Sequence, residues 1–390
     1  MLSFALGLSL LIQTIPQDPL SCLKAIVEIN SGSQNQLGIE RAASWLTQYF
    51  ASIDIQLSWN FFDRSLYGAT KPNEPKGTIL LVGHLDTVFE ETHPFQNLEV
   101  LHTPHTLGPV LRGPGVGDAK GGLILIHELL KNSSIRDQYE IRVFIAADEE
   151  TGSKLSRPSL LDFARGSDLA IVLEPGWIKG SNILIPKTLG GSLLLRFSVK
   201  GPEGHIATST NAGIGAADYL LDLIQGMTRF RSSDASVNIF DLKSESKSNL
   251  ISGLASAQVA VRYHDAQMTQ QIKAYIEDFE RQLPSGIQFE YELKHSWHPI
   301  PLLSDAHMAI AQNAARQLAQ PIPQPARALA RGASAFLAAE GIPVFESMGP
   351  LGEHFHSSDE LIYWGSLEMR LKFIEELIRL NFTSDQTESE

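Results

Sequence analysis

The segment LVGHLDTVF, residues 81–89, constrains the fold of this chain more than any other stretch. It overlaps an apolar run at 78–82, which is typical of a central parallel strand buried on both faces. His84 and Asp86 follow two residues apart, and they therefore point the same way at the end of the strand. Such a pair can form a metal site, in which His84 ligates the ion and Asp86 accepts the other ring N–H. The alternative is a strand that ends in a polar turn.

Two further apolar runs predict buried strands that end in acids. The run at 140–147 is followed by the acids DEE, which include Glu149 and Glu150, and the run at 169–173 is followed by Glu174. Adjacent carboxylates repel one another unless a cation or protons lie among them. Taken alone, the DEE segment could be the acidic first turn of a helix, and Glu174 could be a turn residue.

A glycine-rich segment, LRGPGVGDAKGG at 111–122, lies between the first two of these strands. It has no G-K-S/T, and Lys120 stands where G-x-G-x-x-G needs its third glycine, so it is not a nucleotide loop. It presents one carboxylate, Asp118, which taken alone could be an acid at a helix N-terminus. Because the carboxyl ends of parallel strands form the ligand crevice of an open α/β sheet, we expect Asp118 and the acids above to converge there with His84.

Composition limits the partners and the kind of metal site. The net charge of −13 argues against nucleic acid or an anionic membrane surface as a partner. The single cysteine, Cys22, excludes an intrachain disulfide and thiolate metal sites, so any metal must be held by His, Asp and Glu. The apolar residues 2–12 lack the basic start and the cleavage site of a signal peptide and are too short to span a membrane. We therefore expect a cytoplasmic protein, with export through a degenerate signal as the alternative.

The pattern predicts an α/β fold with a mostly parallel sheet and a smaller inserted domain. Residues 17–187 and 301–382 would form the larger domain. Between them the order becomes β-α-β-β-α-β, the split βαβ of ferredoxin-like α+β domains, so 188–300 would be the insertion. The ends, 1–16 and 383–390, would be weakly ordered.

Six motifs together carry a resemblance to a known family. GHLDTV, GPGVGDAKGG, DEETGS, LEP, GPEGH and HSSDE occur in this order between residues 21 and 382. The set resembles the co-catalytic metallopeptidases, a family that contains glutamate carboxypeptidase of the carboxypeptidase G type, aminoacylase, acetylornithine deacetylase and succinyl-diaminopimelate desuccinylase. Any one motif alone is not specific.

The resemblance implies a zinc-peptidase catalytic domain with two Zn²⁺ ions per chain, or other divalent ions such as Co²⁺ or Mn²⁺. The implied ligands are His84 and Glu174 for one ion, Glu150 and His356 for the other, and Asp118 between them. Asp86 would orient His84. Glu149 would be the general base that activates a water molecule shared by both ions.

The resemblance also implies that the insertion is a lid that forms a homodimer. His205 would polarise the scissile carbonyl, often in the partner subunit's site. Asn249 and Arg262 would hold the carboxylate of the substrate, and the guanidinium fork suits bidentate binding. The alternative for Arg262 is an ordinary surface charge on a strand.

The chain departs from the family pattern at two places, and a third leaves a choice of ligand. The usual His-Ala-Gly after the lid turn is His-Ile-Ala at 205–207. Ser334 is followed by Ala335, where the family often has Asp, which leaves the rim of the substrate pocket in doubt. His354 could compete as a ligand with His356, and we favour His356 because of its spacing to the acidic pair that follows.

These features predict a dizinc hydrolase that cleaves an amide or peptide bond next to a free carboxylate, most like a glutamate carboxypeptidase. The alternative is an N-acyl-amino-acid deacylase, because the same site serves both reactions. The expected substrates are accordingly small peptides or N-acyl amino acids. A rival from another class is a catalytically silent binding protein on this fold.

Overall fold

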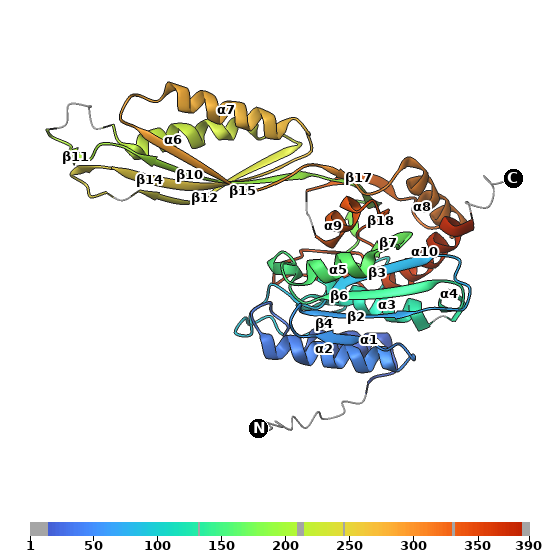
Figure 1. Cartoon of the computed structure of the whole chain (residues 1–390). Helices are drawn as coiled ribbons and strands as arrows, with labels where there is room; N and C mark the ends of the chain where they lie inside the picture. Colours follow the sequence, from blue (N-terminus) through green and yellow to red (C-terminus); the bar gives the residue numbers. More distant parts are fainter. Residues whose placement is uncertain (1–14, 132, 209–213, 245, 330–331, 384–390) are drawn as a thin grey trace, which may run out of the picture. The chain divides into compact units, whose positions relative to one another are not determined.

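The strand β3 (Thr78–His84) lies inside a six-stranded sheet, and its residues from Ile79 onward are buried. The computed structural model describes residues 15–131, 133–208, 214–244, 246–329 and 332–383. The predicted weakly ordered ends lie almost entirely outside these residues. The chain divides into two compact units (Figure 1). The first comprises Met1–Pro186, Leu302–Ala326 and Gly332–Glu390, and the second comprises Lys187–Pro301 and Arg327–Arg331.

The main sheet of the first unit has the strand order β1-β2-β6-β3-β7-β18. Its other strands are β1 (Ser58–Asn60), β2 (Ser65–Thr70), β6 (Glu140–Ala146), β7 (Leu169–Val172) and β18 (Val344–Phe345). The strands from β6 to β18 are parallel, whereas β2 pairs antiparallel with β6. Strand β3 has a parallel neighbour on each side, and helices cover both faces of the sheet (Figure 1), so its apolar run is buried on both faces, as the sequence predicts.

Helices cover both faces of this sheet, with α5 and α9 above it and α1 and α2 below it in Figure 1. The helices of the first unit are α1 (Pro19–Val27), α2 (Gln36–Ala51), α3 (Gly121–Lys131), α4 (Ser133–Arg136), α5 (Ser156–Ala164), α8 (Asp305–Gln317), α9 (Ala333–Ala339) and α10 (Gly365–Thr383). Polar side chains define where the first two begin. Asp18 accepts the Ser21 N–H at 2.8 Å, and Asn35 accepts the Gly38 N–H at 3.0 Å.

The strand β2 is not predicted by the sequence pattern, because Gly68 interrupts a run of only six residues. The glycine is needed there, since a Cβ at residue 68 would lie 2.2 Å from the Gln56 carbonyl oxygen. The strands β1 and β18 are shorter still, with three and two residues. A short apolar run predicts that a strand is present more reliably than it predicts where the strand begins and ends.

A second, small sheet brings two distant loops of the first unit together. Its order is β19-β20-β5-β4, and its strands are β4 (Glu99–Leu101), β5 (Val110–Arg112), β19 (Gly352–Glu353) and β20 (Leu361–Tyr363). Leu361 pairs with Arg112 in the antiparallel register of β20 and β5. The segment just before β20 therefore lies beside the glycine loop that follows β5.

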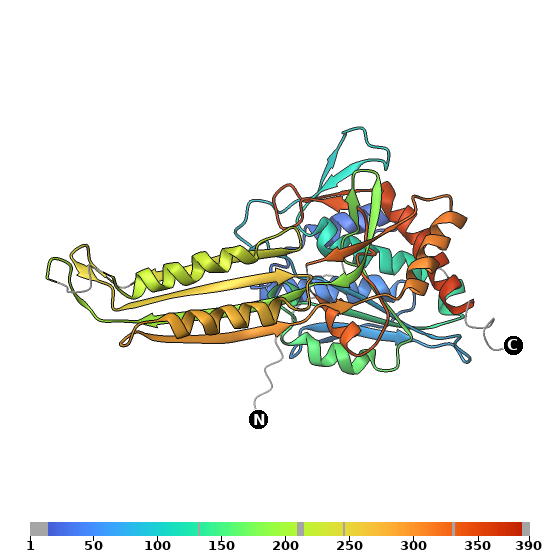
Figure 2. The same ribbon diagram turned by 90° about the horizontal axis from the view of Figure 1, so that it is seen from above.

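The second unit has one four-stranded antiparallel sheet with the order β12-β14-β10-β15. Its main elements are β10 (Gly191–Lys200), α6 (Ala216–Met227), β12 (Ala235–Ser244), β14 (Leu254–Tyr263), α7 (Met268–Gln282) and β15 (Gln288–Trp297). Alternate residues of β10, including Leu193, Leu195 and Phe197, pack against apolar side chains of α6 and α7. Both helices run along the strands (Figure 2). A short pair, β11 (Gly204–His205) and β13 (Leu250–Ile251), joins two loops of this unit.

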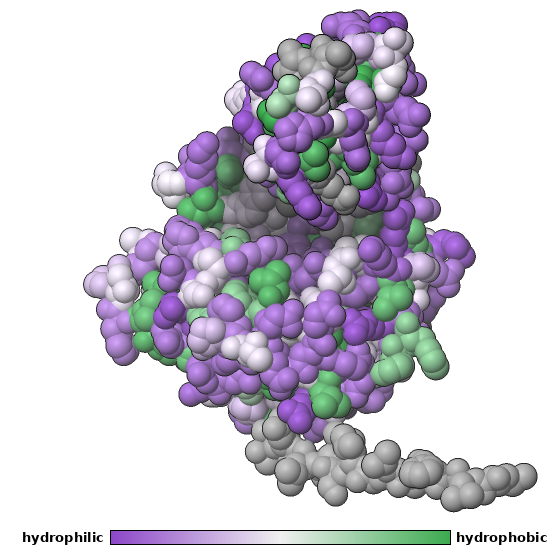
Figure 3. Space-filling model, turned by 90° about the vertical axis from the view of Figure 1, so that its left-hand side faces the viewer, coloured by the Kyte–Doolittle hydropathy of each residue, from purple (hydrophilic) through white to green (hydrophobic). Residues whose placement is uncertain are grey.

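The surface seen in Figure 3 is mostly hydrophilic, with apolar side chains scattered over it. Within the residues that the structure describes, no helix has both the length and the apolar character that a membrane span requires.

We predict that Gly122→Ala destabilises the first unit. A Cβ at this position in α3 would lie 2.2 Å from the Leu173 carbonyl oxygen, directly before Glu174. We expect a loss of about 1–3 kcal/mol in the free energy of unfolding, the usual cost of overpacking. The matched control is Gly204→Ala, because a Cβ there meets nothing within 4 Å. Urea unfolding checks both variants, and equal unfolding free energies would contradict the close approach of α3 to β7.

Candidate metal centre

The carboxyl ends of three parallel strands supply most of the polar side chains of the candidate site. His84 is the last residue of β3, the turn Glu149–Thr151 follows β6, and Glu174 follows β7. Asp118 lies in the glycine loop between β5 and α3, and His356 lies between β19 and β20. All of these residues belong to the first unit.

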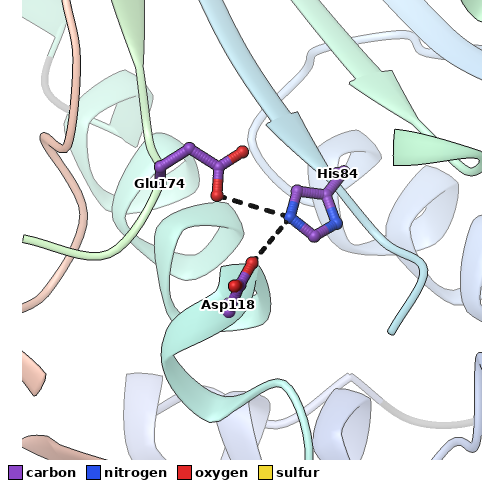
Figure 4. Close-up of side chains that lie close together, drawn as sticks. All are labelled: His84, Asp118 and Glu174. Atoms are coloured by element: carbon purple, nitrogen blue, oxygen red, sulfur yellow. Dashed lines mark hydrogen bonds and ion pairs between the residues drawn. The ribbon is translucent and has the colours of Figure 1, made fainter. Parts of the chain in front are cut away.

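One group of ligand-type atoms surrounds His84 (Figure 4). Its Nε2 lies 2.9 Å from Oδ1 of Asp118 and 3.4 Å from Oε2 of Glu174. His84 is 1% exposed, whereas the side chains of Asp118 and Glu174 are 14% and 20% exposed. A buried imidazole therefore faces two carboxylates that are partly open to solvent.

A second group surrounds His356 and shares Asp118 with the first. Nε2 of His356 lies 3.1 Å from Oδ2 of Asp118 and 3.3 Å from Oε2 of Glu150. In each group the ligand atoms all lie within 4.8 Å of one another. The two oxygens of Asp118 thus face different histidines, which is the arrangement that a carboxylate bridging two ions requires.

Asp86 contacts His84 mainly through its backbone. Nδ1 of His84 lies 3.0 Å from the Asp86 carbonyl oxygen and 3.4 Å from Oδ1 of the side chain. The two carboxylate oxygens accept the backbone N–H groups of Glu149 and Glu150, each at 3.1 Å. Asp86 therefore contacts the histidine and also accepts two N–H groups of the acidic turn after β6, a contact that the sequence does not predict.

The pKa values reflect an excess of negative charge. Burial alone would lower the pKa of His84, but the charge of Glu174 and hydrogen bonds to Asp118 raise it well above its usual range. Hydrogen bonds to Asp118 and Glu150 raise the pKa of His356 to about 10. Burial raises the pKa of Glu174 even though the charge of His84 lowers it. Burial would raise the pKa of Asp118, but hydrogen bonds from His356 and His84 lower it, so the two histidines hold protons while Asp118 between them is ionised.

The residues present fit divalent metal ions. Oε1 of Glu150 is buried and has no hydrogen-bond partner among the described residues, which is costly for a carboxylate oxygen. A metal ion would pair with it. Carboxylate oxygens and imidazole nitrogens are the donors that Zn²⁺ accepts in sites without cysteine.

Glu149 lies next to the two groups but belongs to neither. Burial, followed by the charges of Glu174 and Glu150, raises its pKa well above the usual range, although the charge of His84 opposes this. A Cβ at Gly332 would lie 2.6 Å from Oε1 of Glu149, so a side chain at residue 332 would displace this carboxylate from its observed position. The sequence offers no signal for that contact between residues 183 positions apart.

The other predicted residues of the first unit lie as follows. His354 is exposed and faces Glu353, with Nε2 and Oε2 3.8 Å apart, and it joins neither group. Ser334 is buried in α9, and its hydrogen bond acts on Glu346, whose pKa burial raises to about 8. This buried carboxyl near Glu174 is a further group that the sequence pattern does not predict.

The remaining predicted residues belong to the second unit. They are His205, Asn249 and Arg262. His205 is exposed at the end of β11, and the Ile206 N–H next to it donates to the Asn249 carbonyl oxygen at 3.0 Å. Arg262 lies in β14, and its Nη1 is buried with no hydrogen-bond partner among the described residues. The structure thus brings the first two together and leaves part of a guanidinium group unpaired.

Comparison with known proteins gives the family. The sequence model of the family described as Peptidase family M20/M25/M40 matches residues 80–380, more than half of the chain. The chain is 24% identical over 250 residues to carboxypeptidase G2 of Pseudomonas sp. (strain RS-16), across 62% of this chain and 59% of that protein. It is 25% identical over 209 residues to succinyl-diaminopimelate desuccinylase of Erythrobacter litoralis (strain HTCC2594), across 49% and 53%. The chain therefore matches little more than half the length of these curated relatives.

Solved structures show the same fold. A tripeptidase from Staphylococcus aureus subsp. aureus Mu50 superimposes with a TM-score of 0.74 at 18% identity, covering 94% of this chain and 98% of that one. The YXEP protein of Bacillus subtilis, a dinuclear metal binding peptidase, superimposes with a TM-score of 0.67 at 15% identity, covering 93% and 98%. These likenesses confirm the predicted mixed α/β fold with a mostly parallel sheet.

We predict that substitutions at the two groups remove metal ions in a defined pattern. Asp118→Ala should lose both ions, because its two oxygens face both groups. Glu174→Gln should lose one ion and keep the other, because Glu174 belongs to only one group. Elemental analysis of the purified variants, with the exposed Asp359→Asn as control, checks this. If Asp118→Ala retained an ion that Glu174→Gln lost, Asp118 would not be shared.

Proposed function

The chain belongs to peptidase family M20/M25/M40, and on that premise we propose that it is a two-zinc hydrolase. It cleaves an amide or peptide bond next to a free carboxylate, in the manner of a glutamate carboxypeptidase. The observation that carries this proposal is the position of Asp118. Its Oδ1 lies 2.9 Å from Nε2 of His84 and its Oδ2 lies 3.1 Å from Nε2 of His356. Each of these histidines also lies 3.3 to 3.4 Å from one glutamate oxygen.

In this proposal the first unit holds the metal ions and moves the proton. His84 and Glu174 hold one ion, His356 and Glu150 hold the other, and Asp118 holds both. When bound, two such ions lower the pKa of a water molecule and stabilise the oxyanion that forms on the substrate. Glu149 accepts the proton of the attacking water and donates it to the leaving amine. Burial raises the pKa of this carboxyl although the charge of His84 opposes it, which supports a role for Glu149 in holding a proton.

We further propose that the second unit binds the substrate and forms the homodimer. The unpaired Nη1 of Arg262 supports a role in binding the substrate carboxylate, because a buried guanidinium N–H without a partner is costly. Exposed His205 would polarise the scissile carbonyl, and Asn249 would hold the substrate carboxylate together with Arg262.

The second candidate is an N-acyl-amino-acid deacylase. The similarity to a succinyl-diaminopimelate desuccinylase favours it, because that name describes removal of an acyl group from an amino acid. Both candidates need the same metal ligands and the same base, and they differ only in the group on the far side of the amide bond. A silent binding protein would not need Glu149 beside a full ligand set.

Metal analysis and a substrate screen test the proposal. We expect two Zn²⁺ ions per chain in active protein, loss of activity with a chelator, and recovery on adding Zn²⁺. The screen compares peptides ending in glutamate, N-acyl amino acids, and the same peptides with an amidated C-terminus. Peptides with a free carboxylate should be cleaved and amidated ones should not. Active protein with one ion or none would contradict the dinuclear site, and cleavage of acyl amino acids alone would favour the deacylase.

We predict that the adjacent residues Glu149 and Glu150 have different roles, the first as base and the second as metal ligand. Glu149→Gln cannot accept a proton at neutral pH, so turnover should fall about 10²–10⁴-fold while both ions stay bound. Glu150→Gln replaces a charged ligand by a neutral one, so it should lose zinc as well as turnover. Zinc content and turnover of both variants are the measurements. Metal loss from Glu149→Gln with metal retained in Glu150→Gln would show that the roles are reversed.

A further inference from the structure

Glu360 is a buried carboxylate outside both ligand groups, and it is 1% exposed. Its Oε1 accepts the N–H of Gly117 at 2.9 Å and the N–H of Asp118 at 3.0 Å. Its Oε2 accepts the N–H of Gly115 at 3.2 Å. All three donors belong to the glycine loop that presents Asp118, so one side chain defines where the backbone of that loop lies.

The loop needs an external partner because two of these three donors, Gly115 and Gly117, have no side chains. Gly115 has φ +69°, a left-handed conformation that favours glycine. A Cβ at Gly117 would lie 2.6 Å from a ring carbon of Phe355. A loop built in this way cannot carry a side chain that anchors it at either glycine. Glu360 supplies the acceptors from another segment of the chain.

Glu360 also joins this loop to the segment that carries His356, four residues earlier in the sequence. The Glu360 N–H donates to the Ser357 carbonyl oxygen at 3.1 Å, and the Glu360 carbonyl oxygen accepts the Gly113 N–H at 3.2 Å. Glu360 therefore contacts two of the three segments that supply ligands to the His356 group, those that carry Asp118 and His356.

Asp86 makes the same kind of contact with the turn after β6. Its carboxylate accepts two successive backbone N–H groups, those of Glu149 and Glu150. The charges of Asp86 and Glu360 both act on the fully buried Lys120, whose Nζ donates to the Ile29 carbonyl oxygen at 2.9 Å. Two buried carboxylates thus hold the backbone of ligand-bearing turns, with one buried amine near both.

We propose that Glu360 is a positioning residue of the metal centre, which holds Asp118 and His356 at the spacing that two ions require. The inference rests on the proposed function, because it needs Asp118 to be the shared ligand. Groups that orient metal ligands typically contribute 10- to 100-fold to metal affinity. Glu360 acts through the backbone and touches neither ion.

The test is the affinity of the full chain for Zn²⁺ alone, measured by competition with a chromophoric chelator. Glu360→Gln keeps the size of the side chain but turns an NH₂ group toward N–H donors, so one or more hydrogen bonds are lost. We expect Zn²⁺ binding about 10- to 100-fold weaker than in the unchanged protein. Glu360→Asp retains the carboxylate on a shorter chain and should recover part of the affinity.

Asp359→Asn is the matched control. It removes the same charge from the adjacent residue, but the Asp359 side chain is 80% exposed and its contact with Nε of Arg112 is 3.9 Å long. Its Zn²⁺ affinity should stay within twofold of the unchanged protein. A purely structural role for Glu360 would lower the unfolding temperature of Glu360→Gln and leave the Zn²⁺ affinity of its folded form unchanged.

Two results separate the failure of this inference from the failure of the proposed function. If the unchanged protein binds two ions and folded Glu360→Gln binds them within twofold as tightly, the positioning role is wrong and the two-zinc site stands. If the unchanged protein binds no Zn²⁺, both are wrong.

A measurement on the unchanged protein covers the case in which Glu360→Gln does not fold. Hydrogen exchange of the peptide spanning 113–120 in the metal-free protein should show protected amides, because Glu360 accepts three of its N–H groups. Exchange at the rate of an unstructured peptide would overturn the proposal.

Discussion

Repulsion among buried carboxylates is the constraint on which this structure depends. The charges of Glu174, Glu150 and Asp86 all act on Glu149, and Asp118 lies between the two histidines. A folded chain tolerates such crowding only if positive charge or protons lie among the acids. Two histidines are too few for this set of acids. We therefore expect that divalent ions bound at this site would stabilise the fold as well as supply the proposed chemistry.

Backbone N–H groups stabilise part of this buried negative charge. The carboxylate of Asp86 accepts two N–H groups from the turn after β6, and that of Glu360 accepts three from the glycine loop. These hydrogen bonds compensate for the loss of water around the buried oxygens. They also fix the turns that present Glu150 and Asp118. The same contacts thus stabilise the fold and orient the candidate ligands.

Much of the first unit could be predicted from local patterns. The apolar runs that become β3, β6 and β7 are continuous, so their strands and the edge at which they end follow from the sequence. Strand β2 is not predicted, because Gly68 interrupts its short run and such a run carries little signal. The candidate site was predicted as a set of residues at one edge. The pairing of Asp118 with two histidines rests on the family resemblance, because residues 84, 118 and 356 are far apart in the chain.

The sequence by itself determined which residue types stand at the ends of the strands, because strand periodicity and glycine spacing are local properties. It also determined the family, through six motifs in a fixed order. Only the tertiary structure decided which oxygen of Asp118 faces which histidine, that Asp86 contacts His84 mainly through its carbonyl, and that Glu360 anchors the glycine loop. These contacts join residues up to hundreds of positions apart, and they depend on strand order and side-chain packing, which no local pattern encodes.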